Sequence, residues 1–210
     1  SMISECSLNP TEKPKENDMT NPTRVILLNG PPNVGKDTLA DHLVSLTSDS
    51  CTRSFKEPMY LLLSLLHCIP LERVRELCGN RETKDERCPE FGMSPRKAQI
   101  LLSERVIKPS YGDDWFGRRA AASLVPGFLN VFSDSGFVNE AWPIIHEVGT
   151  KNILLVHMRR EGCSFDHDSR DYLPTDMFPN FTEINNDSGV DMMGAQLLGR
   201  VREWEVACPS

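Results

Sequence analysis

The segment GPPNVGKDT, residues 30–38, places two glycines and a lysine in the spacing GxxxxGK. In a loop of this form, backbone N–H groups surround phosphate oxygens, the glycines allow the close approach, and the lysine reaches toward the phosphates of a nucleotide. Asp37 stands where a serine or threonine commonly contacts magnesium, and the hydroxyl of Thr38 follows one residue later. These residues predict a phosphate-binding loop with an acid at its metal-contact position. A chance match in a surface loop is the alternative.

Asp134 is the second group that phosphate chemistry would use. It ends the segment LNVFSD, which has the apolar character of a buried strand. A carboxylate at a strand end near bound phosphates can hold a hydrated magnesium ion. Aspartate also ends many strands because it favours turns, so the functional interpretation depends on the loop.

Arginine is the third group, because phosphoryl transfer builds negative charge on oxygens that a planar guanidinium can neutralise. Arg159 and Arg160 follow a predicted strand and precede a polar, turn-rich segment, so they are the least typical of ordinary surface charge. Solvated surface charge is the alternative for every candidate. The candidates are Arg81, Arg96, Arg118, Arg119, Arg159, Arg160 and Arg170.

The loop needs a strand before it and a helix after it, and the sequence predicts both. Residues 24–30, RVILLNG, form an aliphatic run that ends in glycine, which is typical of a buried parallel strand. Leucines in DTLADHLVSL then recur at helical spacing. Further strands are predicted at residues 51–56, 128–134, 152–158 and 181–185, and a closing helix at residues 190–204. Five short strands separated by helices predict an α/β, doubly wound, five-stranded parallel sheet, whose ligands bind at the carboxyl ends of the strands.

Two segments interrupt this pattern. Residues 58–127 carry charged and leucine-rich helical segments, one of which begins at Ser94 and Pro95, a favourable N-cap and first-turn pair. Residues 159–179 are polar and turn-rich, and we interpret them as a mobile flap. The chain length fits one domain with insertions, so we assign residues 23–210 to a single domain.

Composition and charge restrict the partners. A net charge of −7 repels a nucleic-acid backbone at long range, so we expect no nucleic-acid partner. The longest apolar run, residues 59–70, is about half the ~20 residues that a membrane-spanning helix needs, so we expect no membrane partner. Seven cysteines without a CxxC pair indicate a reducing, cytoplasmic compartment. Residues 1–22 are polar and have no apolar signal core, so we interpret them as a disordered leader.

A set of motifs spans residues 25–201, and its members in order are GPPNVGKDT, RETKDE, SPRKAQILLSE, GDDWF, SDSGFVNEA, DHDSRDYL and INND. Their residues and order resemble those of the bacteriophage deoxynucleoside monophosphate kinases, distant relatives of the adenylate and guanylate kinases. That family is similar to this sequence in placing aspartate and threonine after the loop lysine. The resemblance implies a P-loop kinase fold and transfer of the γ-phosphate of ATP to a deoxynucleoside monophosphate. ATP and Mg²⁺ would be the cofactors, and residues 58–127 would bind the acceptor.

Matched position by position, the resemblance implies roles for particular residues. The expected ATP contacts are Gly30, Asn33, Gly35, Lys36, Asp37, Thr38 and Arg159. The expected acceptor contacts are Arg96, Lys97, Trp115, Asp134, Glu140 and Arg170. The expected catalytic residues are Lys36, Asp37, Arg96 and Asp134, and Asp134 would also hold magnesium through water.

The sequence departs from the family pattern at three places. Residues 101–104 are LLSE, where the family tends toward a Gly-Thr-Glu turn. Gly136 stands where the family carries a phosphate-binding arginine, and Arg170 stands where it usually carries a glutamate. Our hypothesis is that Arg170, or else Arg118 or Arg119, supplies the missing positive charge. The alternatives are low activity and a changed acceptor.

Other functions share parts of this pattern. A GTPase would normally add an NKxD guanine-recognition signal, which the sequence lacks. A kinase for another small acceptor would share the loop and the sheet. A catalytically weak nucleotide-binding protein also fits, and Gly136 is its best support. A homodimer stays open at this point.

Overall fold

The computed structural model describes residues 21–80, 82–166 and 168–208, so Arg81 and most of the leader assigned to residues 1–22 lie outside the described residues. Its centre is a sheet of five strands in the order β2-β3-β1-β4-β5. The strands are β1 (Arg24–Asn29), β2 (Ser50–Arg53), β3 (Leu129–Ser135), β4 (Ile153–Arg159) and β5 (Asn180–Asn185). Every neighbouring pair is parallel. The predicted five-stranded parallel sheet is therefore confirmed.

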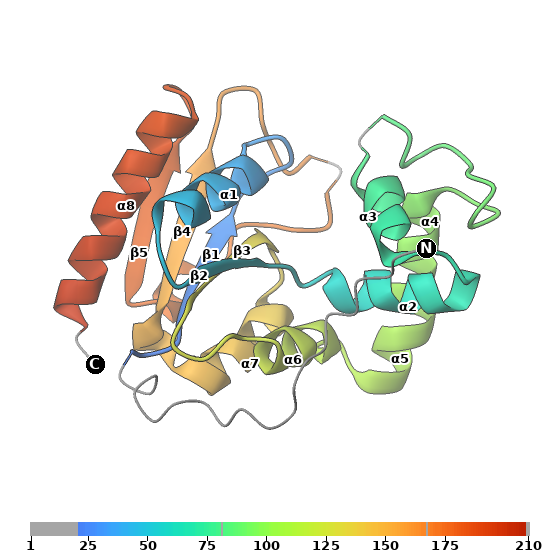
Figure 1. The fold of residues 1–210 in the computed structure, drawn as a ribbon, viewed down its shortest axis with the longest axis horizontal. Coiled ribbons are helices and arrows are strands. Elements are labelled where there is room, and N and C mark those ends of the chain that lie inside the picture. Colours follow the sequence, from blue (N-terminus) through green and yellow to red (C-terminus); the bar gives the residue numbers. More distant parts are fainter. Residues whose placement is uncertain (1–20, 81, 167, 209–210) are drawn as a thin grey trace, which may run out of the picture.

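β1 lies at the centre of the sheet and is covered on both faces (Figure 1). Ile26 and Leu28 belong to one buried cluster, and Val25 and Leu27 belong to another. All four side chains are fully buried. A strand that is buried on both faces needs apolar residues at successive positions, which explains the aliphatic run that marks β1 in the sequence.

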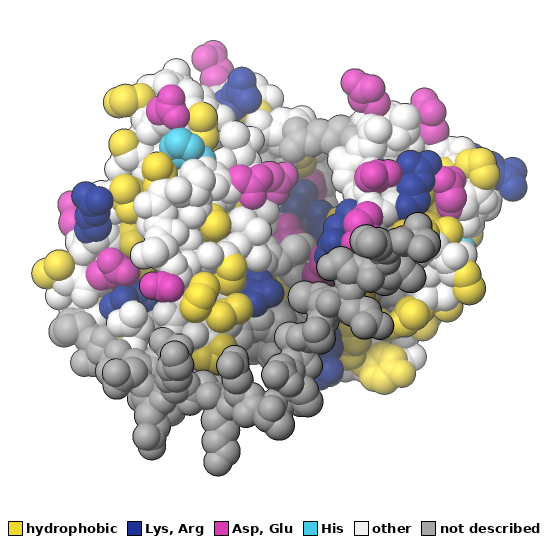
Figure 2. All heavy atoms as spheres, viewed as in Figure 1, with side chains coloured by type: hydrophobic (Ala, Val, Ile, Leu, Met, Phe, Trp, Pro, Cys, Tyr) yellow, Lys and Arg dark blue, Asp and Glu magenta, His cyan; other side chains and the backbone are white. Residues whose placement is uncertain are grey.

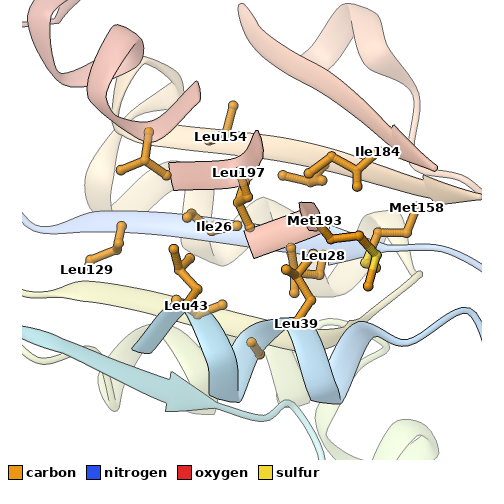
Figure 3. Close-up of a cluster of buried hydrophobic side chains, with 14 of the residues drawn as sticks. Ile26, Leu28, Leu39, Leu43, Leu129, Leu154, Met158, Ile184, Met193 and Leu197 are labelled. Carbon is orange, nitrogen blue, oxygen red and sulfur yellow. The ribbon is translucent and has the colours of Figure 1, made fainter. Parts of the chain in front are cut away.

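One face of the sheet is covered by α1 (Lys36–Leu46) and α8 (Val190–Ala207), which pack against each other. The side chains between these helices and the sheet include Ile26, Leu28, Leu39, Leu43, Met193 and Leu197 (Figure 3). Each such buried aliphatic side chain stabilises the fold by roughly 1.5–3 kcal/mol. Because this cluster fixes both β1 and α1, the loop that joins them is held at both of its ends.

The other face is covered by α6 (Trp115–Ala122) and α7 (Val138–Val148), so the sheet is doubly wound as predicted. Ala120, Ala141 and Ile144 form part of the cluster on this face. The two helices cross closely at Gly117, where a Cβ would stand 2.4 Å from the carbonyl oxygen of Glu140. This crossing brings the first turn of α7 beside α6.

A group of helices, called here the helical lobe, stands beside the sheet and has a separate buried cluster (Figure 1). It consists of α2 (Glu57–His67), α3 (Leu71–Gly79), α4 (Pro95–Ile100), η1 (Leu101–Ile107) and α5 (Lys108–Tyr111). Ser94 caps α4 as predicted, because its hydroxyl accepts a hydrogen bond from the N–H of Lys97 at 3.3 Å. α6 also touches the lobe, since Phe116 belongs to the lobe's cluster.

The long helix of the lobe is π-helical in its middle, where the sequence predicts an ordinary helix. η1 joins α4 to α5 without a break. Pro109 gives the physical reason, because it has no N–H to donate and its ring clashes with the carbonyl group of the residue four positions earlier. The helix widens in the preceding turn, and π-helical turns of this kind are frequent at functional sites.

The segment between β4 and β5 includes the short helix η3 (Thr175–Met177) and is tied to the carboxyl ends of the strands. Nδ2 of Asn29 donates to the carbonyl oxygen of Asp171 at 3.1 Å, and its Oδ1 accepts from the N–H of Leu173 at 2.7 Å. The hydroxyl of Tyr172 donates to the carbonyl oxygen of Met158 at 3.0 Å. The segment predicted as a mobile flap is therefore anchored at residues 171–173, which lie against the sheet.

Candidate functional site

The GPPNVGK loop connects β1 to α1, and its glycines lie where a side chain does not fit. A Cβ on Gly30 would stand 2.5 Å from the carbonyl oxygen of Met158. Gly35 has a φ of 101°, in the left-handed region, and its Cβ would stand 2.8 Å from Nδ2 of Asn186. Asn33 has a φ of 66°, which asparagine tolerates better than most residues. The loop is therefore tightly folded, as close approach to a phosphate requires.

Residues that follow β4 and β5 hold this loop in place. Nδ2 of Asn186 donates to the carbonyl oxygen of Val34 at 2.8 Å, and Nη1 of Arg160 donates to that of Asn33 at 3.4 Å. Gly35 is the N-cap of α1 and has no side chain with which to cap the first turn. A helix N-terminus directs N–H groups and partial positive charge outward, so this end of α1 favours an anion.

Lys36 begins α1 and is only 8% exposed. Its Nζ donates hydrogen bonds to the carbonyl oxygens of Gly30 at 2.6 Å and Pro31 at 2.8 Å. Burial, and after it the positive charge of Arg170, lowers the pKa of Lys36 to about 8. The ammonium group is thus desolvated beside the loop, and a phosphate there would be its favourable partner.

A bulge in β3 turns two consecutive side chains toward the loop. The register between β1 and β3 shifts before Ser135, so β3 has one more residue than β1 at this point. Ser133 and Asp134 lie at the shift, and both line the cavity beside the loop. Successive side chains of a regular strand point to opposite faces, and a bulge changes that direction. The hydroxyl of Ser133 donates to Oδ1 of Asp37 at 2.7 Å, which places the unusual acid at this strand end.

Asp134 anchors the turn that follows β2. Its carboxylate accepts hydrogen bonds from Oγ of Ser54 at 2.6 Å, the N–H of Phe55 at 3.1 Å and the N–H of Lys56 at 3.3 Å. With these donors in place, the carboxylate suits a magnesium ion that keeps its water shell and enters with substrate phosphates. In the described part of the chain, His, Cys, Asp and Glu form no group of three or more that could hold a metal by itself.

Two cavities meet beside the loop. The loop cavity has a volume of about 320 Å³ and is lined by the loop, including Lys36 and Asp37. The lobe cavity has a volume of about 400 Å³ and lies in the hollow between the sheet and the helical lobe, where Figure 2 shows basic and acidic side chains together. Lys56, Asp134 and Arg170 line both cavities. We call these three residues the shared wall, because ligands in the two cavities would meet there.

The lobe cavity combines an apolar wall with polar and charged groups. The apolar wall consists of Phe55, Met59, Ile100, Phe116 and Phe137. The uncharged and acidic groups, apart from the shared wall, include Gln99, Ser103, Glu104 and Glu140, and Ser103 and Glu104 come from the π-helical turn. The basic groups are Lys56, Arg96, Lys108 and Arg170. Aromatic and aliphatic surfaces suit a flat ring, and the basic groups suit an anionic group on the same molecule.

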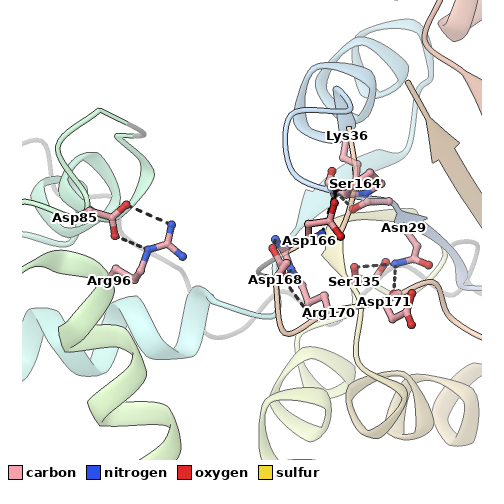
Figure 4. A network of polar contacts seen from close by, with 12 residues as sticks. Asn29, Lys36, Asp85, Arg96, Ser135, Ser164, Asp166, Asp168, Arg170 and Asp171 are labelled. Atoms are coloured by element: carbon pink, nitrogen blue, oxygen red, sulfur yellow. Dashed lines mark hydrogen bonds and ion pairs between the residues drawn. The ribbon is translucent and has the colours of Figure 1, made fainter. Parts of the chain in front are cut away.

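Arg96 faces the shared wall from the lobe side. Its Nε lies 2.5 Å from Oδ1 of Asp85. Figure 4 shows this pair on the lobe, across the cavity from Lys36 and from the pair formed by Asp168 and Arg170. Two positively charged groups on opposite sides of one cavity could bind one anionic group between them.

Arg170 occupies the space that a side chain on Gly136 would take. A Cβ on Gly136 would stand 2.8 Å from Cβ and 2.9 Å from Cγ and Cδ of Arg170. The guanidinium forms two hydrogen bonds with Asp168, at 2.9 Å from Nε and 2.7 Å from Nη2. The stem of Arg170 therefore packs on the backbone where the family pattern carries its arginine, and its charge lies on the shared wall.

Arg118 and Arg119 are the other two arginines proposed to replace the positive charge that is missing at Gly136, and both lie outside the two cavities. Arg118 is exposed and pairs with Asp114 one helical turn earlier. Arg119 is exposed and lies over the ring of Trp115, with its Cζ 5.9 Å from the ring centroid. Neither of them lines a cavity, so their positions do not support this part of the hypothesis.

Trp115 and Arg159 are expected site residues that the structure places outside both cavities. Phe116, the next residue along α6, lines the lobe cavity and packs edge-on against Trp115. Arg159 pairs with Glu183 at 2.6 Å on the surface, and it is the following residue, Arg160, that contacts the loop. In both cases the residue that lines the cavity or contacts the loop is the next one along the chain from the expected residue.

Thr38 and Lys97 are also exposed and lie outside the two cavities. Gly30 begins the loop but lines neither cavity, and the remaining expected residues fall into two groups. Asn33, Gly35, Lys36 and Asp37 line the loop cavity. Arg96, Glu140, Asp134 and Arg170 line the lobe cavity, and the last two also line the loop cavity.

Several cavity residues are missing from the sequence-based set, above all Lys56, Gln99 and Glu104. Lys56 could have been found, because it follows the second strand and the carboxyl ends of parallel strands meet at one edge of the sheet. Whether Gln99 and Glu104 line the cavity depends on which face of the lobe helix is turned to the sheet, and Glu104 lies in the π-helical turn, where the ordinary helical spacing does not apply.

Glu140, in the first turn of α7, is 9% exposed and lines the lobe cavity. Burial, and after it the negative charge of Asp134, raises the pKa of Glu140 to about 8. Nearby positive charges, including those of Lys108 and Lys56, oppose this shift without reversing it. At neutral pH the side chain is therefore mostly protonated, and it can both donate and accept hydrogen bonds.

We expect the Glu140→Gln variant to be more stable than the wild type at high pH. Between the unfolded pKa near 4.5 and the folded value near 8, the unfolded chain releases a proton that the folded chain retains. The wild type therefore loses stability as pH rises through this window, by up to about 4 kcal/mol, and glutamine removes that loss. Urea unfolding at about pH 5 and about pH 8.5 measures the difference. An equal difference at both pH values, or the same change in the exposed control Glu147→Gln, would contradict the assignment.

A scan against protein-family models and a search of curated proteins return no match. Among solved structures, a sugar kinase from Janibacter sp. HTCC2649 is 12% identical over 86% of this chain and 95% of its own, with a TM-score of 0.40. A gluconokinase from Sinorhizobium meliloti 1021 is 14% identical over 89% of this chain and 97% of its own, with a TM-score of 0.40. A thymidylate kinase from Candida albicans is 12% identical over 87% of this chain and 92% of its own, with a TM-score of 0.42. Likenesses at this level carry no functional conclusion.

In the described ranges, no helix is both long enough and apolar enough to cross a membrane.

Proposed function

We propose that the chain is a P-loop phosphotransferase that moves the γ-phosphate of ATP to a deoxynucleoside monophosphate and produces ADP and the diphosphate. One observation carries this proposal: the loop cavity and the lobe cavity share a wall formed by Lys56, Asp134 and Arg170. A phosphate held by the loop would end at this wall, and an anionic group in the lobe cavity would reach it from the other side. An enzyme that only hydrolyses ATP has no use for the second cavity.

The loop cavity supplies what the donor needs. The tight turn at Gly35 and the N-terminus of α1 favour phosphate oxygens, and the desolvated ammonium group of Lys36 adds a positive charge. Asp37 and Asp134 would contact the water shell of a magnesium ion bound with the triphosphate, and that ion would neutralise phosphate charge. These residues bind and orient the donor.

The lobe cavity supplies what a nucleotide acceptor needs. Phe55, Phe116 and Phe137 offer ring surfaces for a base, which gain little from a sugar alone. Gln99 and Glu104 offer hydrogen-bonding groups for the edge of the base. Lys56 and Arg170 lie on the shared wall and Arg96 faces it across the cavity, so the acceptor's phosphate would lie between them. The sequence motifs that resemble the deoxynucleoside monophosphate kinases support the same acceptor.

The chemistry that remains for the protein is positioning and charge stabilisation. The acceptor is an ionised phosphate oxygen, so the transfer needs no strong general base. The two phosphates must be aligned and kept away from water, because ATP would otherwise be hydrolysed. The lobe and the segment that carries Arg170 lie on opposite sides of the lobe cavity and can exclude water when both ligands are bound.

A coupled ADP-release assay with ATP and magnesium tests the proposal against an acceptor panel. The panel contains dAMP, dCMP, dGMP, dTMP and the ribose counterparts, with shikimate as a control acceptor. We expect at least one deoxynucleotide to raise ADP release by about tenfold or more over ATP alone, because a bound acceptor replaces water at the shared wall. Stimulation by shikimate alone would favour a kinase for another acceptor. ATP binding without stimulation by any acceptor would favour a catalytically weak binding protein.

A further inference from the structure

We propose that Lys56 is a catalytic residue of this transfer, whose ammonium group contacts the phosphoryl group as it passes between the two cavities. The proposal rests on the proposed function, and it adds a residue that the sequence motifs do not assign. Asp134 then acts as a positioning residue that holds Lys56 in place.

The first support is the position of Lys56. It is the N-cap residue of α2, and its side chain lines both the loop cavity and the lobe cavity. The other two residues of the shared wall are an acid and Arg170, so Lys56 supplies one of the two positive charges at the junction. A group at that junction can touch both the donor and the acceptor phosphate.

The second support is the way its backbone is held. The carboxylate of Asp134 accepts hydrogen bonds from the N–H of Lys56 at 3.3 Å and from the N–H of Phe55 at 3.1 Å. It also accepts a hydrogen bond from the hydroxyl of Ser54 at 2.6 Å. Oγ of Ser54 in turn accepts the N–H of Lys56 at 3.0 Å. The start of α2 is thus fixed to the bulge of β3, because Ser54, Phe55 and Lys56 all donate hydrogen bonds to Asp134. Such preorganisation makes a charged group effective in a transition state.

The third support is the availability of its charge. The other three basic groups that line the lobe cavity are already paired: Arg96 with Asp85, Lys108 with Glu104, and Arg170 with Asp168. Among residues 21–80, 82–166 and 168–208, the ammonium group of Lys56 forms neither an ion pair nor a hydrogen bond. A phosphate could therefore take this positive charge without displacing an existing partner from the described residues.

The pKa shifts of two neighbouring groups agree with this position of Lys56. Burial is the main cause of the lowered pKa of Lys36, and Arg170 and then Lys56 lower it further. The pKa of Asp168 falls to about 2, mainly because Arg170 donates hydrogen bonds to it, and Lys56 contributes to the same shift. The charge of Lys56 is therefore felt at both the loop and the segment that carries Arg170.

The reaction that Lys56 would assist is a direct displacement. A bond forms between an acceptor phosphate oxygen and the γ-phosphorus, and the bond from that phosphorus to the β,γ-bridging oxygen breaks. The electron pair of the broken bond stays on ADP, and no proton needs to move. Negative charge spreads over the equatorial oxygens of the phosphoryl group in transit, and an ammonium group beside them stabilises that charge.

We would test this with Lys56→Met and Lys56→Arg, with Lys151→Met as the control at an exposed lysine remote from both cavities. We expect Lys56→Met to lower kcat by at least about tenfold while KM for ATP and acceptor change by less than about threefold. Lys56→Arg should retain more of kcat than Lys56→Met, because it keeps the charge. Asp134→Asn should lower kcat with the same pattern, since the amide cannot accept all three hydrogen bonds.

The outcomes separate this proposal from the proposed function. If the wild type transfers phosphate and Lys56→Met keeps kcat within about threefold, the catalytic role of Lys56 is overturned and the kinase proposal stands. A loss seen only as a higher KM for ATP would also overturn it, because Lys56 would then be a binding residue. If the wild type transfers no phosphate to any acceptor, the proposed function itself fails.

Discussion

Replacing Lys36 with methionine is expected to lower kcat/KM for phosphoryl transfer by about 10²–10³-fold, the typical cost of removing one preorganised charged donor. The ammonium group of Lys36 lies beside the loop and is held by the carbonyl oxygens of Gly30 and Pro31. A bound phosphate would give this buried charge an anionic partner. Methionine keeps the length of the side chain and removes the charge, so the coupled ADP-release assay should show a loss in both ATP binding and turnover.

The same variant has a stability signature that separates a missing charge from a damaged fold. The folded wild type releases the proton of Lys36 near pH 8, whereas the unfolded chain retains it to about pH 10.5. Raising the pH through this window therefore stabilises the wild type, by about 2–3 kcal/mol, and Lys36→Met should lack this gain. Urea unfolding at about pH 7.5 and about pH 10 measures it.

Two results would contradict the role of Lys36. One is a Lys36→Met variant that keeps kcat/KM within about tenfold of the wild type. The other is an equal loss in the control Lys151→Met, which removes a charge far from the loop.

The second large effect is expected at Arg170. Arg170→Ala should lower kcat/KM by more than about tenfold, because it removes a guanidinium from the shared wall. Arg170→Lys should recover only part of the activity, since a lysine does not reproduce the two hydrogen bonds to Asp168. Steady-state kinetics with ATP and the best acceptor measure both effects.

The packing of Arg170 on Gly136 makes a sharper experiment available. Gly136→Arg alone should also lower activity, because its Cβ would stand 2.8 Å from the Cβ of Arg170. In the double variant Gly136→Arg with Arg170→Ala, the space filled by the side chain of Arg170 is open. The guanidinium introduced at position 136 can then occupy it. We expect the double variant to be more active than either single variant, so the two effects should be strongly non-additive. Unchanged kinetics in Arg170→Ala, or losses that simply add in the double variant, would remove Arg170 from the site.

The strands and the loop could be predicted because their residues carry local signals. β1 is buried on both faces, so its aliphatic run marks it directly, and the glycines of the loop follow from contacts that a side chain would violate. The closing helix was also evident, although α8 extends to Ala207, beyond the predicted end at residue 204. In contrast, α7 was not identified, because Pro143 lies inside it and weakens the helical pattern.

The site was predicted less completely because its cavities depend on long-range contacts. The bulge in β3 turns Ser133 and Asp134 toward the loop cavity, and the π-helical turn brings Ser103 and Glu104 to the lobe cavity. Glu104 lies in the π-helical turn and was missed, and in α6 the cavity is lined by Phe116 and not by the expected Trp115. Arg170 could be proposed only from a family pattern, whereas its contact with Gly136 required the structure.

The most direct measurement is a single-turnover reaction with ATP that is labelled in its γ-phosphate, magnesium and the acceptor that best stimulates ADP release. Separation of the products shows where the label goes. Two cavities with a shared wall predict that the label appears in the deoxynucleoside diphosphate, with little inorganic phosphate. Release of the label mainly as inorganic phosphate in the presence of the acceptor, or its retention in ATP, would contradict the account.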